Sequence, residues 1–321
     1  MSRPTILLTR RWPAAVEAHL AERYLVTANV DDVPLTSAQL AAGMRSHDAI
    51  CPTVTDRLGA AEIDAPGRHA RIVANFGAGY EHIDLDACRI TGVAVTNTPG
   101  VLTDATAELT LTLMLMAARR AGEGERLVRA GAWTGWGPTQ LLGHSLVGKR
   151  LGLIGYGRIA QAVGDMARAA LGMTVSYWTG RPERGAAPDG AQRVEDLGAL
   201  LADADVVSLH CPGGAATHHL IDARRLSQMK PHAVLINTAR GSVVDEAALA
   251  EALAARRIGA AGLDVYASEP AVAPALLALD NVVLLPHLGS ATEETRTAMG
   301  MLVAENLDLF FAGAPLRNRV A

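Results

Sequence analysis

The stretch Leu151-Gly-Leu-Ile-Gly155-Tyr-Gly157-Arg-Ile-Ala160 decides the fold, because it joins a short apolar run to a glycine turn and the start of a helix. The apolar run predicts a buried strand, and apolar residues at helical spacing beyond it predict the helix. In the spacing G-x-G-x-x-A, Gly155 makes the turn, Gly157 lets the backbone approach a pyrophosphate and Ala160 permits close packing. Dinucleotide binding is the favoured interpretation, and a structural strand-to-helix turn is the alternative.

The composition describes a globular chain with room for two domains. Of 321 residues, 50% are hydrophobic and 19% are charged, which excludes disorder. The net charge of −4 gives no electrostatic reason to expect nucleic acid. Three cysteines without paired spacing favour a reducing compartment over a disulfide framework. Without a visible signal peptide or an apolar segment long enough to span a bilayer, we expect a soluble, cytoplasmic protein that does not bind membranes.

Strand and helix patterns alternate along the chain, which predicts an α/β fold with parallel sheets. In the first part the expected strands are Thr5–Thr9, Ala49–Cys51, Arg71–Ala74 and Val93–Thr96. In the second part they are Leu151–Ile154, Thr174–Trp178, Val206–Leu209, Val234–Ile236, Ala261–Leu263 and Val282–Leu285. The clearest expected helices are Thr103–Arg120, Asp245–Ala255 and a final one from Ser290 to Phe311. Six strands around the glycine turn are the content of a doubly wound dinucleotide domain.

The residues after the second strand of this set indicate which dinucleotide binds. A Rossmann unit that binds NAD normally carries an acidic residue there for the adenosine ribose. Here Thr179 takes that place, and Arg181, with Arg184 nearby, offers a cation to a 2′-phosphate. We therefore expect NADP(H) in preference to NAD(H). The alternative is that Arg181 is only a solvated loop cation.

Three residues that follow successive expected strands could carry chemistry: Arg240, Glu269 and His287. An arginine at a strand end can clamp a carboxylate through two hydrogen bonds. A hydride delivered to a carbonyl carbon requires a proton on the oxygen, and histidine can donate it near neutral pH. Glu269 on the other ring nitrogen would favour the protonated ring. The alternatives are a surface salt bridge for Arg240 and a structural role for His287.

Other features are less specific. The loop Asn75–Tyr80 contains two glycines after a strand and could expose N–H groups as an anion nest or simply form a tight turn. The Gly- and Trp-rich connection 122–148 is either functional or a packed loop. His218 and His219 lie near His210, but their spacing matches no zinc pattern, so no metal site is predicted.

These residues resemble the D-isomer-specific 2-hydroxyacid dehydrogenases over essentially the whole chain. The matching motifs are Phe76–Gly79, Thr103–Glu108, Gly155–Ala160, His210–Pro212, Asn237–Gly241, Asp264–Pro270 and Pro286–Thr292. Within the family, Trp133–Pro138 through Leu142-Gly143, and Trp178–Arg181, are most similar to the glyoxylate/hydroxypyruvate reductases.

The resemblance implies two Rossmann-like doubly wound domains. A discontinuous, flavodoxin-like substrate-binding domain would comprise residues 1–99 and 288–321, and an NAD(P)-binding domain residues 100–287. It also implies a homodimer built on the central domain, in which the Trp-bearing connection reaches the partner subunit.

The resemblance further implies roles for individual residues. Arg240 would bind the 2-oxoacid, His287 would donate the proton and Glu269 would be its partner. The substrate would also meet Phe76, Gly77, Ala78 and Gly79, whose backbone N–H groups would hold the carboxylate. Thr103 would lie beside the nicotinamide and Asp264 near its carboxamide. The remaining cofactor contacts would come from Gly155, Gly157, Arg158, Ile159, Thr179, Arg181, His210, Cys211, Pro212, Thr217, Thr238, Ala239 and Gly289.

Two departures from the family pattern stand out. Ala160 replaces the third glycine, and Phe76 is a bulky first residue expected to shape the pocket. The expected activity is NADPH-dependent reduction of glyoxylate and hydroxypyruvate. The alternatives are another D-2-hydroxyacid dehydrogenase of the lactate, phosphoglycerate or branched type, and a non-catalytic nucleotide sensor of the same fold. Formate dehydrogenase is disfavoured because that type carries Gln where Glu269 stands.

Overall fold

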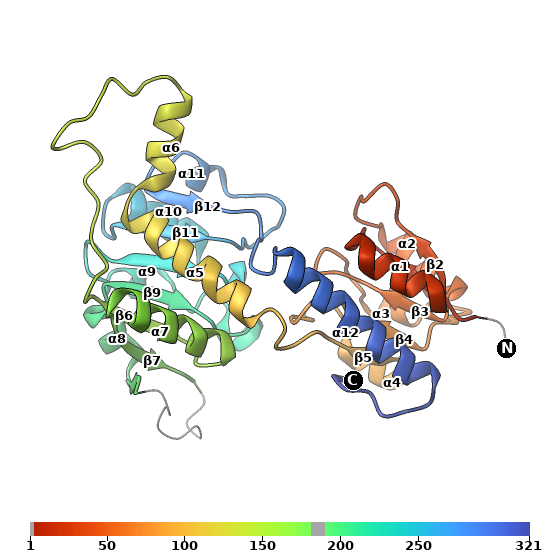
Figure 1. Ribbon diagram of the computed structural model, residues 1–321. Coiled ribbons are helices and arrows are strands. Elements are labelled where there is room, and N and C mark those ends of the chain that lie inside the picture. Colours follow the sequence, from red (N-terminus) through yellow and green to blue (C-terminus); the bar gives the residue numbers. More distant parts are fainter. Residues whose placement is uncertain (1–2, 181–189) are drawn as a thin grey trace. The chain divides into compact units, whose positions relative to one another are not determined.

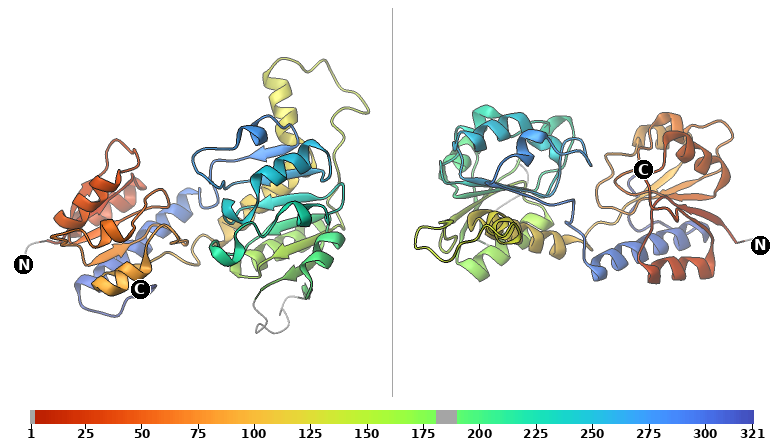
Figure 2. Two further views of the ribbon diagram at one scale, coloured as in Figure 1. Left: turned by 180° about the vertical axis from the view of Figure 1, so that it is seen from behind. Right: turned by 90° about the horizontal axis from the view of Figure 1, so that it is seen from above.

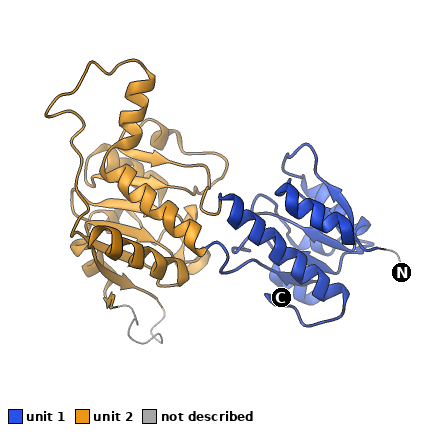
Figure 3. Cartoon of the chain, in the orientation of Figure 1, with its two compact units in different colours: residues 1–102, 291–321 blue, residues 103–290 orange. Residues whose placement is uncertain are grey.

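The computed structural model describes residues 3–180 and 190–321, and the chain divides into two compact units (Figure 3). Unit 1 comprises residues 1–102 and 291–321, and unit 2 comprises residues 103–290. The boundaries expected from the sequence lie between residues 99 and 100 and between residues 287 and 288. Each unit contains one parallel sheet with helices packed on it, so the predicted fold class is confirmed.

The sheet of unit 1 has the strand order β2-β1-β3-β4-β5, the flavodoxin-like order (Figure 1). Its strands are β1 (Thr5–Leu8), β2 (Leu25–Ala28), β3 (Ala49–Cys51), β4 (Ile72–Ala74) and β5 (Ala94–Thr96). Its helices are α1 (Ala14–Arg23), α2 (Ser37–Ser46), α3 (Ala60–Ile63), α4 (Leu85–Thr91) and α12 (Glu293–Phe311). Alternate residues of β1 enter different cores. Ile6 and Leu8 pack with α1 and α12, and Leu7 packs with α2 and α4.

The sheet of unit 2 has the order β12-β11-β10-β9-β6-β7-β8, in which β6 is flanked by β9 and β7. Its strands are β6 (Arg150–Ile154), β7 (Thr174–Trp178), β8 (Gln192–Arg193), β9 (Val206–Leu209), β10 (Val234–Asn237), β11 (Ala260–Leu263) and β12 (Val282–Leu284). Its helices are α5 (Thr103–Ala118), α6 (Ala121–Arg129), α7 (Arg158–Leu171), α8 (Leu197–Asp203), α9 (Ala223–Leu226), α10 (Glu246–Ala254) and α11 (Pro274–Leu277). The strand order reverses between β6 and β9, so the crevice for a ligand is expected at their carboxyl ends.

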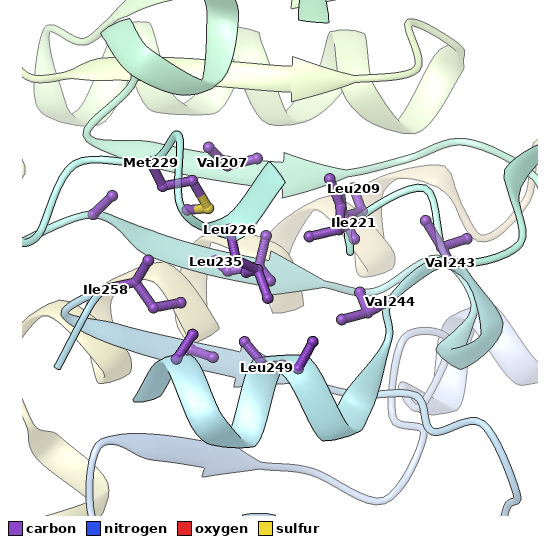
Figure 4. Close-up of a cluster of buried hydrophobic side chains, with 14 of the residues drawn as sticks. Val207, Leu209, Ile221, Leu226, Met229, Leu235, Val243, Val244, Leu249 and Ile258 are labelled. Carbon is purple, nitrogen blue, oxygen red and sulfur yellow. The ribbon is translucent and has the colours of Figure 1, made fainter. Parts of the chain in front are cut away.

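Helices cover both faces of this sheet (Figure 2). Leu113 of α5 and Val163 of α7 pack on one face. Leu249 of α10 packs on the other face with Val207 and Leu235 from the strands (Figure 4). Both faces of the sheet are therefore buried, which explains why the sequences of these strands are short, continuous apolar runs.

The expected strands form within one residue at each end, but β2 and β8 were missed. In β2, exposed and partly buried residues alternate at the sheet edge, and Leu25 is 51% exposed. β8 is a two-residue edge strand of Gln192 and Arg193, with no apolar pattern to detect. The final helix starts at Glu293, not Ser290, because the Thr292 side chain caps it.

An aspartate anchors the sheet of unit 1 at its amino edge. Asp48 immediately precedes β3, and its Oδ2 accepts the backbone N–H of Thr5 in β1 at 2.8 Å. Its Oδ1 lies 3.0 Å from Nε2 of His69, which belongs to the segment before β4. One carboxylate thus ties together the starts of three adjacent strands.

Unit 2 repeats the arrangement with Asp205, which immediately precedes β9. Its Oδ2 accepts the N–H of Arg150 in β6 at 2.9 Å. Its Oδ1 lies 2.9 Å from both Lys230 Nζ and His232 Nε2, in the segment before β10. Burial would raise the pKa of Asp205, but these donors outweigh burial and hold the pKa well below its usual range.

A carboxyl whose pKa is depressed by folding stabilises the protein above its unfolded pKa and loses this effect as pH falls through the folded value. Asp205→Asn should therefore lower the free energy of unfolding at pH 7 by about 1–3 kcal/mol. The deficit should shrink below about pH 4. The control is Asp203→Asn, since Asp203 forms only an exposed ion pair with Arg150. Urea unfolding from pH 3 to 8 measures both, and equal small losses would contradict the anchoring role.

Candidate active site

The glycine turn after β6 depends on close backbone packing. Gly155 has a φ of 88°, and a Cβ there would lie 2.7 Å from the Cys211 nitrogen and 2.8 Å from the His210 carbonyl carbon. Gly157 caps α7 without a side chain, and a Cβ there would meet nothing within 4 Å. The first N–H groups of α7 therefore face open space, where an anion can bind. Ala160 is fully buried beneath the turn.

His210 and Cys211, at the end of β9, present no charge to this turn. The His210 ring lies 2.9 Å from the Ser208 hydroxyl, and burial lowers the pKa of His210 to about 3. Burial also raises the pKa of the Cys211 thiol to about 11. Both side chains are neutral near pH 7, so neither counters the positive end of α7. The contact between Ser208 and His210 was not predicted, since nothing in the residue type of Ser208 distinguishes it from other serines.

The other predicted cofactor residues in the described part of unit 2 lie at the carboxyl ends of the strands or at the starts of the helices beside them. They are Arg158 and Ile159 at the start of α7, Thr179 after β7, Pro212 and Thr217 after β9, Thr238 and Ala239 after β10, Gly289 after β12, and Thr103 at the start of α5. The Thr217 hydroxyl donates to the Pro212 carbonyl at 2.6 Å, and the Thr238 hydroxyl pairs with that of Thr110 at 2.9 Å. The residues present fit a dinucleotide. Arg181 and Arg184 lie outside the described residues.

Asp264 organises the turn that carries His287. Its backbone carbonyl accepts the N–H of His287 at 3.0 Å. Its two carboxylate oxygens accept the N–H groups of Leu288 and Gly289 at 2.7 and 2.8 Å. His287 is held in the left-handed region with a φ of 55°. Burial raises the pKa of Asp264, although the two N–H donors act in the opposite direction. The predicted contact of Asp264 with the cofactor stays a prediction.

Glu269 and His287 form the central pair of the site. His287 Nδ1 lies 2.7 Å from Glu269 Oε2, and the other glutamate oxygen accepts the Tyr266 N–H at 3.0 Å. Burial would raise the pKa of Glu269, but the bond and charge of His287, the Tyr266 N–H and the charge of Arg240 together lower it. Glu269 is thus a carboxylate, which can accept a hydrogen bond from His287 Nδ1. Both side chains are about one-third exposed, at 33% and 34%.

Arg240 belongs to the same edge because β10, β11 and β12 are adjacent and parallel. The Asn237 side chain accepts the Ala239 N–H at 3.0 Å and donates to the Arg240 carbonyl at 2.9 Å. The next residue, Gly241, touches the Tyr266 backbone so closely that a Cβ would lie 1.9 Å from its carbonyl carbon. The structure therefore brings together the three residues expected from the sequence.

In unit 1, the loop Phe76–Gly79 has its carbonyls turned into the protein. Asn75 Nδ2 donates to the carbonyls of Gly77 and Gly79 at 3.0 and 2.9 Å, and Asn97 Nδ2 donates to that of Ala78 at 2.7 Å. Within residues 3–180 and 190–321, no acceptor binds the N–H groups of Gly77, Ala78 or Gly79. They form a nest suited to an anion.

Phe76, at the start of this loop, packs against the core of unit 1. Its ring packs on Trp12 with centroids 4.6 Å apart, and it joins the core beneath α1 and α12. Phe76 is only partly buried, so the prediction that it shapes the pocket stays a prediction.

A cavity of about 450 Å³ lies elsewhere in unit 2, at the amino ends of the strands. Its lining includes Met116, Ala118, His144, His232, Ile258 and Val283. It is therefore separate from the Arg240–Glu269–His287 site. Across residues 3–180 and 190–321, no group of three or more His, Cys, Asp or Glu side chains could hold a metal ion. In the same part of the chain, no helix is long and apolar enough to cross a membrane.

The two glycines of the turn should respond differently to substitution. Gly155→Ala should destabilise unit 2 by about 2–4 kcal/mol, because of its positive φ and the backbone contact. Gly157→Ala should leave stability within about 0.5 kcal/mol, since the site is open, yet weaken dinucleotide binding about 10-fold or more by blocking close approach. Thermal unfolding and fluorescence titration with NADPH measure the two effects. Unchanged affinity in Gly157→Ala would contradict its assigned role.

Comparison with known proteins shows which family this chain resembles. The family model "D-isomer specific 2-hydroxyacid dehydrogenase, NAD binding domain" matches residues 111–289. A glyoxylate reductase from Thermococcus litoralis is 40% identical over 315 residues, covering 97% of this chain and 95% of the relative. A solved structure of a Thermus thermophilus protein is 41% identical with a TM-score of 0.91, covering 99% of this chain and 100% of that one.

A further solved structure is an NADPH-dependent glyoxylate/hydroxypyruvate reductase from Sinorhizobium meliloti, in complex with NADP and malonate. It is 37% identical with a TM-score of 0.87, covering 100% of this chain and 97% of that one. The resemblance expected from the motifs is confirmed. The chain belongs to the family of D-isomer-specific 2-hydroxyacid dehydrogenases, which are NAD(P)-dependent oxidoreductases.

Proposed function

We propose that the protein reduces glyoxylate to glycolate and hydroxypyruvate to D-glycerate with NADPH. The observation that carries this proposal is the 2.7 Å bond between His287 and Glu269, at the same sheet edge as Arg240 and the glycine turn. Relatives described as glyoxylate reductases, at about 40% identity over nearly the whole chain, support the choice of substrate.

His287 is the proposed proton donor. Its Nδ1 is engaged by Glu269, so Nε2 is the ring nitrogen left to donate to a substrate oxygen. Glu269, kept ionised, stabilises the protonated ring and fixes its orientation. When bound, the reduced nicotinamide supplies a hydride to the 2-oxo carbon. Proton donation from Nε2 then yields the hydroxyl group.

Two other groups are proposed to bind the acid. The Arg240 guanidinium can bind the substrate carboxylate and 2-oxo oxygen and so orient the carbonyl. The open N–H groups of Gly77–Gly79 are proposed to hold the carboxylate, which suits an anion because each N–H lacks an internal acceptor among the described residues.

Purified protein should consume NADPH with glyoxylate and hydroxypyruvate faster than with pyruvate or 2-oxoisovalerate, as followed by absorbance. His287→Gln should lower kcat by about 10²- to 10⁴-fold, because proton donation is lost. It should change the affinity for NADPH by less than about twofold. His144→Gln, an exposed histidine at the opposite sheet edge, serves as the control. Preference for another 2-oxoacid would reassign the substrate, and no turnover with any would favour the sensor alternative.

The proposed preference for NADPH rests on sequence: Thr179 stands where an acid would bind the ribose, and Arg181 follows. Arg181→Ala should raise the KM for NADPH about 10-fold or more and leave the KM for NADH unchanged, because a charged bond to the 2′-phosphate is lost. Arg224→Ala, an exposed arginine on α9, is the matched control. An unchanged ratio of the two KM values would remove this reason for preferring NADPH.

We also propose a homodimer. Helix α6 has no buried residue, although Val128 on it is apolar and 59% exposed. Trp133 and Trp136 in the connection that follows are 53% and 83% exposed. A second copy covering this apolar surface is the simplest explanation. A monomeric mass by light scattering would contradict it. The cytoplasmic location stays a prediction.

A further inference from the structure

Tyr266 lies among the three proposed catalytic residues. A Cβ added to Gly241, the residue after Arg240, would lie 1.9 Å from the backbone carbonyl carbon of Tyr266, so the two backbones are in close contact. The N–H of Tyr266 donates to Glu269 Oε1 at 3.0 Å. Its hydroxyl donates to the Leu285 carbonyl at 2.8 Å, two residues before His287. One residue thus contacts the segments carrying all three.

The bonds of Tyr266 close a ring. From Tyr266 the ring runs through the N–H bond to Glu269, then through the 2.7 Å bond to His287. It returns along the backbone to Leu285 and through the carbonyl to the Tyr266 hydroxyl. A closed ring limits how far Glu269 and His287 can move apart, whereas an open one leaves each on its own loop.

The loop is also held from outside the ring. Glu246, in the first turn of α10, accepts the N–H of Ala267 at 2.7 Å. Tyr266 is only 8% exposed, and burial raises the pKa of Tyr266 above its usual value. The hydroxyl is therefore protonated at any working pH and is always a donor.

We propose that Tyr266 is a positioning residue for the reductase: its hydroxyl bond to Leu285 keeps Glu269 and His287 in register for proton donation. This proposal rests on the role assigned to His287 under the proposed function. Packing alone explains the ring but not the hydroxyl, because a phenylalanine ring would fill the same buried space. The proposal gives the hydroxyl a role.

Tyr266→Phe removes only the hydroxyl. We expect kcat to fall about 3- to 10-fold, the loss of one buried hydrogen bond, with little change in the KM for NADPH. The acid limb of the kcat/KM profile should move to higher pH, because a less firmly held His287 lowers the pKa of Glu269 less. The matched control is Tyr24→Phe, which removes a half-buried hydroxyl that donates to Asp308 at 2.6 Å in unit 1.

A second readout is independent of turnover. The ¹⁵N shifts of the His287 ring, assigned by their loss in His287→Gln, report which nitrogen carries the proton. In the unliganded Tyr266→Phe protein they should move toward a mixture of tautomers, while Tyr24→Phe leaves them unchanged. Glu246→Ala, which frees the outer side of the same loop, should shift them in the same direction but less.

An unchanged pH profile and unchanged ¹⁵N shifts in folded Tyr266→Phe would overturn the proposal. So would equal changes in Tyr24→Phe, which would show a general effect of stability. Failure of the proposed function looks different: the wild-type protein would turn over no 2-oxoacid, yet the ¹⁵N shifts would still report whether Tyr266 positions His287.

Discussion

The site of this protein depends on one buried carboxylate, that of Asp264 at the end of β11. A buried anion is costly unless donors surround it. The carboxylate of Asp264, a residue that is 1% exposed, accepts the N–H groups of Leu288 and Gly289, and the backbone carbonyl of Asp264 accepts the N–H of His287. The chain after β12 must turn to present those groups, and the turn places His287 in a left-handed conformation. The direction in which the histidine faces is therefore set by the hydrogen bonds of an aspartate on the neighbouring strand.

Two glycines also fix the positions of loops at the carboxyl ends of the strands in unit 2. Gly155 and Gly241 both bring one loop backbone against the next, where any side chain would collide. At Gly155 the contact joins the ends of β6 and β9 and forms the glycine turn. At Gly241 it sets the arginine loop against the loop that carries Glu269. Parallel order brings strand ends to one edge, but these contacts bring their loops within hydrogen-bonding reach of one another.

At the amino ends of the strands, both sheets carry a carboxylate that contributes to stability. Asp48 and Asp205 occupy equivalent places, each ahead of a central strand, and each ties that strand to its two neighbours. The two units thus share a division between an amino edge with ionic anchors and a carboxyl edge with open N–H groups. In unit 1 that carboxyl edge carries the nest of residues 77–79, and in unit 2 the start of α7.

The sequence by itself determined the class of fold and pointed to the residues that we propose to react. Buried parallel strands read as apolar runs, and Arg240, Glu269 and His287 each follow one, so their meeting at one edge could be predicted. Edge strands β2 and β8 were missed because half-exposed or polar residues carry little pattern.

Only the tertiary structure decided which bonds Asp264 and Tyr266 make. Both act through bonds to residues about twenty positions away. The local sequence pattern indicates which residues are buried and which form turns. Hydrogen bonds between distant residues form only once the strands lie side by side.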